Sequence, residues 1–430
     1  MRAPSRQEGL GLVLLCLAGT LILGFVHKEH CASGVWQDGR QYRTLCYSDI
    51  VPLLATEQLS GGRLPYLDRC APAAGECDEY PVLTMYTMRV AAWLIPGGSG
   101  PGPAPPPTAR DFATFFAANA TVISVAAFVT VIGTYMVAGR RALMVALAPT
   151  LLIYAFMNWD LMAVAFATAG VVAYLRKRDV WAGILLGLGT AAKLYPGLLL
   201  VPLVLGRLRS REPDRAVHLM WAAAGAWLLV DLPFALVSFG SWSEFFRFNS
   251  TRVADYDSLW FIGCKAVTGQ PYCTHTEAIS LLSLMVFVGI SVMIWHLKTA
   301  RHPGFPAWTF AFPLLVVFLL SNKVYSPQYG LWLLPWFAWT LPDVRRFVAF
   351  EIADVAVFVT RFAWFGRIDP NIGGWVNGVS FGMFELAVLA RAAVLVWCLV
   401  AWIRREPEPE PEPASLQGAE AAAEPDPSAA

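Results

Sequence analysis

The fold is decided by residues 158–205, NWDLMAVAFATAGVVAYLRKRDVWAGILLGLGTAAKLYPGLLLVPLVL. Three apolar stretches follow one another there, and we predict that 160–175, 180–193 and 194–206 each form a helix through a membrane. The basic cluster at 176–178 separates the first two, and a polar corner separates the last two. These helices are short for a hydrocarbon core of ~30 Å.

The composition extends this interpretation to the whole chain. Of the 430 residues, 57% are hydrophobic and only 15% are charged, with a mean hydropathy of +0.52. A soluble protein of this size needs more charge to cover its surface. The net charge of +1 gives no reason to expect nucleic acid as a partner. The remaining predicted spans are 9–26, 112–138, 216–239, 278–297 and 379–403, which are clear, and 142–157, 306–320, 329–342 and 347–364, which are shorter.

These spans predict an all-α membrane protein of about twelve transmembrane helices. The basic residues gather at every second gap between spans, as they do when both termini are cytoplasmic. The first outer loop is then 27–111, and the N-terminal apolar run is an uncleaved first span, because no small-x-small cleavage site follows it. We expect one membrane domain over 1–405 and a disordered cytoplasmic tail over 406–430, rich in Pro, Glu and Ala.

The cysteines support this orientation. Two of the eight lie within predicted spans, and the other six all lie in predicted outer loops, as expected for disulfides in an oxidising compartment. Pairing between sequence neighbours gives Cys31–Cys46, Cys70–Cys77 and Cys264–Cys273, although six cysteines allow fifteen connectivities. A zinc site is the alternative, but the histidines that it needs are not nearby.

Three polar positions stand out at the outer ends of the spans. Asp49 precedes a short amphipathic segment that is predicted to lie in the membrane interface, so its carboxylate either faces the bundle or caps that segment. Asn158 and Asp160 form a tight corner, where a carboxylate either caps the next helix or binds sugar hydroxyls or another group. Lys193 ends a long apolar run, so it either snorkels to the surface or meets an anion such as phosphate.

Further polar residues lie on the same predicted face. They are Glu79 and Tyr80 before a proline, Arg252 in the 240–277 loop, Tyr195 in the KLYP corner, and Lys323, Tyr325, Gln328 and Tyr329 in SNKVYSPQYGLWLLPW. Aromatic and amide groups suit a sugar, and cations suit a phosphate. One pocket that joins a lipid phosphate to a sugar explains the set better than unrelated helix caps do.

Five ionisable residues lie within the last predicted spans. These are Glu351, Asp354, Arg361, Glu385 and Arg391. They are most simply ion pairs between helices, although such residues are functional candidates by default.

The segments CYSDIVPLL, EYPVLT, 158–205 and NKVYSPQYGLWLLP together resemble actinobacterial members of glycosyltransferase family 87. The resemblance runs from about Asp49 to Pro335. It implies a helical bundle of the GT-C class in the plasma membrane, with an extracytoplasmic active site and a polyprenyl-phosphate sugar donor. It implies mannose as the sugar, with arabinose as the alternative. In that class an acidic residue in the first outer loop is the catalytic base, and Asp49 matches that position.

We therefore expect an inverting transfer to a lipid or cell-envelope glycan acceptor. Asp49 removes the acceptor proton, while Lys193, Lys323 and Arg252 bind the donor phosphate. Sugar or acceptor contacts are expected from Glu79, Tyr80, Asn158, Asp160, Tyr195, Tyr325, Gln328 and Tyr329. Neither a metal nor a cofactor is expected. The alternative function is a transporter or flippase of a lipid-linked sugar, which needs polar groups through both leaflets.

Overall fold

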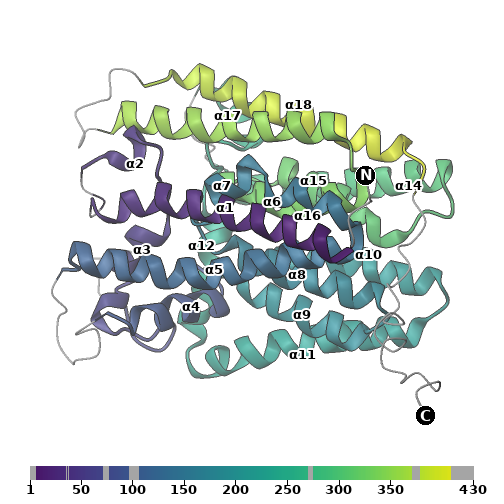
Figure 1. Ribbon diagram of the computed structural model, residues 1–430, viewed down its shortest axis with the longest axis horizontal. Helices are drawn as coiled ribbons and strands as arrows, with labels where there is room; N and C mark the ends of the chain where they lie inside the picture. Colours follow the sequence, from purple (N-terminus) through teal and green to yellow (C-terminus); the bar gives the residue numbers. More distant parts are fainter. Residues whose placement is uncertain are drawn as a thin grey trace, which may run out of the picture.

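The computed structural model describes residues 6–34, 36, 38–70, 77–95, 106–269, 275–369 and 378–407. Five of its helices are long and apolar enough to cross a membrane, and they correspond one to one with the five clear predicted spans. These helices are α1 (Arg6–Ala32), α5 (Ala109–Ala138), α11 (Pro213–Val237), α14 (Thr276–Arg301) and α18 (Phe381–Arg404). Figure 1 shows them running along the long axis of the molecule.

The other helices are shorter or more polar. They are α2 (Arg40–Arg43), α3 (Ile50–Thr56), α4 (Val82–Ala92), α6 (Leu143–Ala146), α7 (Pro149–Tyr154), α8 (Asp160–Leu175), α9 (Asp179–Ala192), α10 (Tyr195–Arg209), α12 (Phe239–Thr251), α13 (Leu259–Thr268), α15 (Ala311–Ser321), α16 (Leu334–Thr340) and α17 (Val344–Ile368). The 3-10 helices are η1 (Leu59–Gly61), η3 (Gly139–Ala142), η4 (Ala307–Phe310) and η5 (Pro327–Leu333).

Prolines divide two of the predicted spans. The expected span 142–157 is two short helices, α6 and α7, with Pro149 at the start of the second. The expected span 329–342 is the end of the 3-10 helix η5 followed by α16, with Pro335 in the first turn of α16. Proline lacks a backbone N–H and so suits the first turn of a helix but not its interior. These segments are not single spanning helices, and the predicted count of about twelve is not confirmed.

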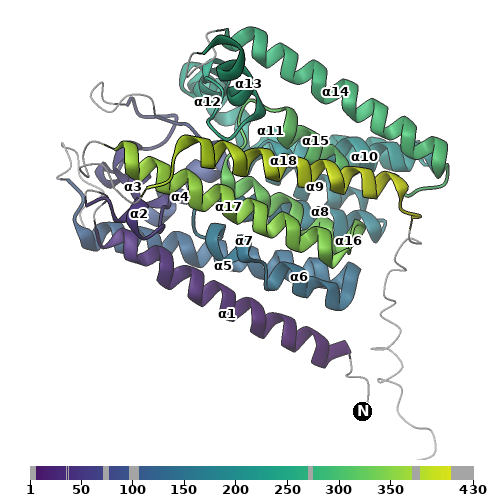
Figure 2. The same ribbon diagram turned by 90° about the horizontal axis from the view of Figure 1, so that it is seen from above.

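The bundle has two distinct ends (Figure 2). The first-loop helices α2, α3 and α4 lie at one end, whereas α1 begins and α18 ends at the other. Figure 2 also places α1 and α14 on opposite sides of the bundle. Asn158, just before α8, donates a hydrogen bond to Asp49 at the start of α3, and Lys193, just before α10, pairs with Asp160. The polar corners that begin α8 and α10 therefore lie at the end where the first-loop helices lie.

The structure does not confirm the predicted interfacial position of the helix α3. Its apolar side chains Ile50, Leu53 and Leu54 are buried, and the helix packs against α5. The apolar face of this helix thus packs against protein. Sequence periodicity identifies an apolar face, but it does not distinguish lipid from protein as its partner.

Buried ion pairs tie the last helices together. Arg391 of α18 lies 3.2 Å from Asp354 of α17, which confirms a pair between these helices. Arg361 of α17 pairs instead with Asp255 and Asp257, which precede α13.

The other two acidic residues of this region have different partners. Glu351 accepts hydrogen bonds from the backbone N–H and the hydroxyl of Thr150 at the start of α7. Glu385 pairs with Lys265 of α13 at 3.0 Å.

Two predicted disulfides are present, Cys31–Cys46 and Cys70–Cys77. Cys273 of the third predicted pair lies outside the described residues. So do most of the connector 96–108 and nearly all of the predicted tail 406–430.

Candidate active site

A cavity of about 580 Å³ brings together most of the residues that the sequence singled out. Its walls come from the first loop, the corners before α8 and α10, α12, the segment 322–332 and the end of α17. Ten of the twelve predicted site residues line it, namely Asp49, Glu79, Tyr80, Asn158, Lys193, Tyr195, Arg252, Lys323, Gln328 and Tyr329. Asp160 and Tyr325 do not.

The amide of Asn158 organises the acidic side of the cavity. Its Nδ2 donates to Asp49 Oδ2 at 2.8 Å and to the Tyr80 hydroxyl at 2.7 Å. Its Oδ1 accepts the N–H of Trp159 at 2.6 Å, which fixes the orientation of the amide. Asp49 stands at the start of α3, but its side chain makes no capping hydrogen bond. The carboxylate therefore belongs to the cavity and not to the helix end.

The surroundings of Asp49 change its acidity. Burial raises the pKa of its carboxyl group above the ordinary value. Hydrogen bonds from Asn158 and Tyr47 and the nearby charge of Lys193 act in the opposite direction. A carboxylate whose pKa is raised accepts a proton more readily, which suits a general base.

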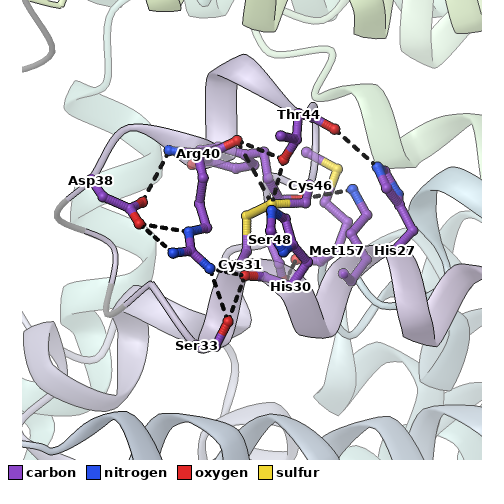
Figure 3. Close-up of a disulfide and its surroundings, with 12 residues drawn as sticks. His27, His30, Cys31, Ser33, Asp38, Arg40, Thr44, Cys46, Ser48 and Met157 are labelled. Atoms are coloured by element: carbon purple, nitrogen blue, oxygen red, sulfur yellow. Dashed lines mark hydrogen bonds and ion pairs between the residues drawn. A yellow bond between two sulfur atoms is a disulfide. The ribbon is translucent and has the colours of Figure 1, made fainter.

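The segment that carries Asp49 is held to α1 by two contacts, of which Figure 3 shows the disulfide. The disulfide Cys31–Cys46 joins the last turn of α1 to the residue three before Asp49. One helical turn earlier, the fully buried Lys28 donates from Nζ to the carbonyl of Tyr47 at 2.7 Å.

The same segment is held on its other side by the corner before α8. The hydroxyl of Ser48 donates to the carbonyl of Phe156 at 2.7 Å. The backbone N–H of Asp49 donates to the carbonyl of Met157 at 2.8 Å. Each of the four residues 46–49 thus has its own attachment, so little freedom remains in the position of the carboxylate.

Lys193 forms a buried ion pair with Asp160. Its Nζ lies 2.8 Å from Asp160 Oδ2, and the lysine side chain is 16% exposed while that of Asp160 is fully buried. The second carboxylate oxygen of Asp160 accepts the indole N–H of Trp332 at 2.7 Å. Asp160 therefore neither lines the cavity nor caps α8, but positions the ammonium group that does line it.

Three aromatic rings form a stack along one wall. Trp332 lies between Tyr195 and Tyr329, with a distance of 4.1 Å between ring centroids on each side. The ammonium of Lys193 lies 5.1 Å from the Tyr329 ring centroid. Such a stack offers apolar ring surface and hydroxyl groups together, which is the chemistry that binds a sugar ring.

The other two predicted phosphate ligands differ in their freedom. Lys323 donates to the carbonyl of Ser250 and to the hydroxyl of Ser280, at 2.8 and 2.9 Å. Arg252 keeps 33% of its side chain exposed and lies 3.6 Å from Asp255. Of these two, Arg252 is the freer to meet a ligand.

Tyr325 lies away from the cavity. Its ring stacks under the guanidinium of Arg391, at 3.6 Å, among the buried charges of α17 and α18. Gln328 does line the cavity, and its Oε1 accepts no hydrogen bond from any described residue.

Sequence reasoning missed several residues of this site. Trp332 and Tyr47 line the cavity, and Lys28 donates a hydrogen bond to the carbonyl of Tyr47. The sequence did contain a signal for Lys28, because it is a cation at the end of an apolar span. The two aromatics carried no such signal, since membrane proteins place many aromatics at interfaces for other reasons.

Within the described part of the chain, no group of three or more His, Cys, Asp or Glu side chains is arranged to hold a metal ion.

Comparison with known families assigns the chain. The model of glycosyltransferase family 87 matches residues 104–327, slightly more than half of the chain, so the protein belongs to this family. It is therefore a glycosyltransferase, and with its apolar helices a multi-pass membrane protein. Asp49 precedes the matched range, so its role depends on the geometry described above.

No curated protein matches this sequence. Among solved structures, the chain is similar to the crystal structure of ArnT from Cupriavidus metallidurans bound to undecaprenyl phosphate. The identity is 16% and the TM-score 0.45, with 91% of this chain and 76% of that chain covered.

Proposed function

We propose that this protein transfers a sugar from a polyprenyl-phosphate donor to a lipid or cell-envelope glycan acceptor, with inversion at the anomeric carbon. The observation that carries the proposal is the meeting of Asp49, Lys193 and the aromatic stack in one cavity. A base, a cation for phosphate and a sugar platform are what this reaction needs.

In the proposed step the hydroxyl oxygen of the acceptor attacks the anomeric carbon of the sugar, and Asp49 takes the proton of that hydroxyl group. The bond between that carbon and the phosphate oxygen breaks, and the phosphate leaves with the electron pair. Because the leaving phosphate is already anionic, it needs no general acid. This distinguishes the reaction from glycoside hydrolysis, where two carboxyl groups share the work.

Lys193 stabilises the leaving phosphate, with Arg252, which also lines the cavity, as a second cation. Lys323 contributes a further positive charge, although its hydrogen bonds already go to Ser250 and Ser280. A donor with a single phosphate requires no metal when such cations surround it, so we propose that the enzyme uses neither metal nor cofactor.

The sugar is proposed to lie against Tyr195, Tyr329 and Gln328, with Glu79 and Tyr80 closer to the acceptor. The family resemblance favours mannose as the sugar. The arrangement of basic clusters favours an active site on the extracytoplasmic face of the plasma membrane, with both termini in the cytoplasm.

The test is transfer of a labelled sugar by purified protein in detergent or liposomes. Polyprenyl-phosphate mannose and polyprenyl-phosphate arabinose are supplied separately, each with a lipid extract as acceptor. We expect transfer with one donor, and a fall of about 10²- to 10⁴-fold in Asp49→Asn, the usual contribution of a general base.

Asp38→Asn is the matched control, because Asp38 is an acidic residue of the same loop that does not line the cavity. Undiminished transfer by Asp49→Asn would remove this residue from the base role. Transport of intact lipid-linked sugar without transfer would refute the proposed function.

A further inference from the structure

Three of the cations that line the catalytic cavity, Arg252, Lys323 and Arg361, share one neighbour, Asp255. Its carboxylate lies 3.6 Å from the guanidinium of Arg252 and 3.2 Å from that of Arg361. Its backbone N–H donates to the carbonyl of Lys323 at 2.8 Å. The side chain of Asp255 is only 7% exposed and does not line the cavity. Asp255 therefore stands behind the cations and joins them to one another.

These contacts belong to a row of charges that leads from the cavity into the protein. Three arginines alternate with three aspartates in it, in the order Arg252, Asp255, Arg361, Asp257, Arg391 and Asp354. The last three side chains are at most 1% exposed, whereas that of Arg252 is 33% exposed. Equal numbers of opposite charges leave the row neutral, which lowers the cost of burying it. Its inner end is embedded in the protein, and its outer end reaches the cavity.

The position of Arg252 depends on Asp255 because its own helix packs loosely. Arg252 directly follows α12, all of whose residues are described and none of which is fully buried. Its guanidinium lies over the ring of Phe248, but that ring belongs to the same helix and moves with it. The ammonium of Lys323 donates to the carbonyl of Ser250 near the end of α12. Asp255 contacts both Arg252 and Lys323, so it connects this helix end to the rest of the protein.

The placement of Arg252 matters because this residue and Lys193 face the same part of the cavity. The positive charges of Lys193 and Arg252 both act on the hydroxyl of Tyr329, and all three residues line the cavity. Lys193 has a buried carboxylate behind it, that of Asp160, at 2.8 Å. Arg252 has the carboxylate of Asp255 behind it in the same way. Each cation of the proposed phosphate site is thus paired with a buried aspartate.

We propose that Asp255 is a positioning residue for the transfer reaction, which holds Arg252 at the donor phosphate and so raises kcat without touching a substrate itself. This inference rests on the proposed function. Negative charge grows on the phosphate as its bond to the anomeric carbon breaks, so a cation that is already in place stabilises the transition state best. A displacement of about 1 Å at such a group can cost about 10²-fold in rate.

The experiment is a double-mutant cycle on Arg252 and Asp255, in which the transfer assay gives kcat and the donor KM of each variant. Asp255→Asn keeps the shape of the side chain and removes its charge. We expect kcat to fall about tenfold while the donor KM stays nearly constant, since the cation is still present but no longer fixed. Arg252→Gln should lower kcat at least as much. In the double variant Asp255→Asn should have no further effect on kcat, because the cation through which Asp255 acts is gone.

Asp179→Asn is the matched control. Asp179 is also a buried carboxylate, 5% exposed, with two arginine partners, Arg207 at 2.7 Å and Arg215 at 3.3 Å. It begins α9, and Lys193 follows the other end of that helix, so Asp179 lies far from the cavity. Its substitution should lower the melting temperature, since it leaves buried arginine charge without its partner, but should leave kcat of the folded protein unchanged.

Three results would overturn the inference: effects that multiply in the double variant, an unchanged kcat in Asp255→Asn, or an equal fall in kcat in Asp179→Asn. If Asp255→Asn does not fold, the double variant decides, since it again has equal numbers of arginines and aspartates in the row. A kcat equal to that of Arg252→Gln then supports the inference, and a further fall overturns it. If wild-type protein transfers sugar from no donor, the proposed function fails instead.

Discussion

The Lys193–Asp160 pair allows a structural role to be separated from a catalytic one. Lys193→Gln removes the cation and leaves the carboxylate of Asp160 buried, with only the indole N–H of Trp332 to compensate it. Removing one partner of a buried pair costs 3–5 kcal/mol in general, and we expect about 3 kcal/mol here because Lys193 retains some exposure. In the double variant Lys193→Gln/Asp160→Asn no charge is left buried. Its stability should return to within about 1 kcal/mol of wild type, since two amides can hydrogen-bond to each other.

Activity should follow a different pattern from stability. If Lys193 stabilises the leaving phosphate, its loss should lower kcat by about 10²- to 10³-fold, as for other electrostatic groups at a reacting centre. The double variant should be equally inactive although its fold is restored. Lys193→Arg, which keeps the charge, should retain more activity than either.

Thermal unfolding in detergent micelles and the transfer assay on the same preparations test both patterns. Recovery of activity together with stability in the double variant would refute the phosphate role. If Lys193→Gln is as stable as wild type, the reasoning about the buried pair is refuted.

Three further predictions concern the side of the cavity that holds the base. Asn158→Ala removes a hydrogen bond that favours the ionised form of Asp49, so the pKa of Asp49 should rise. The acid limb of the pH profile of kcat/KM should then move to higher pH. An acid limb at the same pH as in wild type would contradict this. Lys28→Met removes the hydrogen bond to the carbonyl two residues before Asp49, so kcat should fall about tenfold while the donor KM stays constant. Lys28→Arg should retain part of the kcat that Lys28→Met loses. A change in KM alone would exclude a positioning role. Reducing the disulfide Cys31–Cys46, which closes a separation of 15 residues, should lower the free energy of unfolding by roughly 3 kcal/mol, measured by thermal unfolding with and without reductant.

The sequence predicted the long helices well and the broken ones poorly. Apolar runs of eighteen or more residues have few alternatives to a spanning helix, so all five clear spans were found. Pro149 and Pro335 lie within apolar runs, yet each stands in the first turn of a new helix. A window of hydropathy averages over such breaks, and it therefore merged two elements into one span.

Most of the cavity could be predicted because charge patterning placed the polar corners on one face. Which of these side chains contact one another could not be predicted. Asp160 and Trp332 are 172 residues apart in sequence, and nothing local indicates that they meet. Tyr325 was grouped with Gln328 and Tyr329 by proximity in sequence, yet its ring lies under Arg391. Side chains of neighbouring residues in an irregular segment point in different directions, and periodicity does not predict which of them face the cavity.

The attachments of residues 46–49 bear on when the enzyme becomes complete during synthesis. The hydroxyl of Ser48 and the N–H of Asp49 donate to the carbonyls of residues 156 and 157, which are synthesised about a hundred residues later. The ring of Tyr47 stacks on that of Phe362 of α17, with 4.3 Å between the ring centroids, and Phe362 is synthesised later still. The proposed base is among the first fifty residues to be made, but its surroundings are finished only when α17 has joined the bundle. A chain that stops before α17 should therefore insert in the membrane without acquiring a working site.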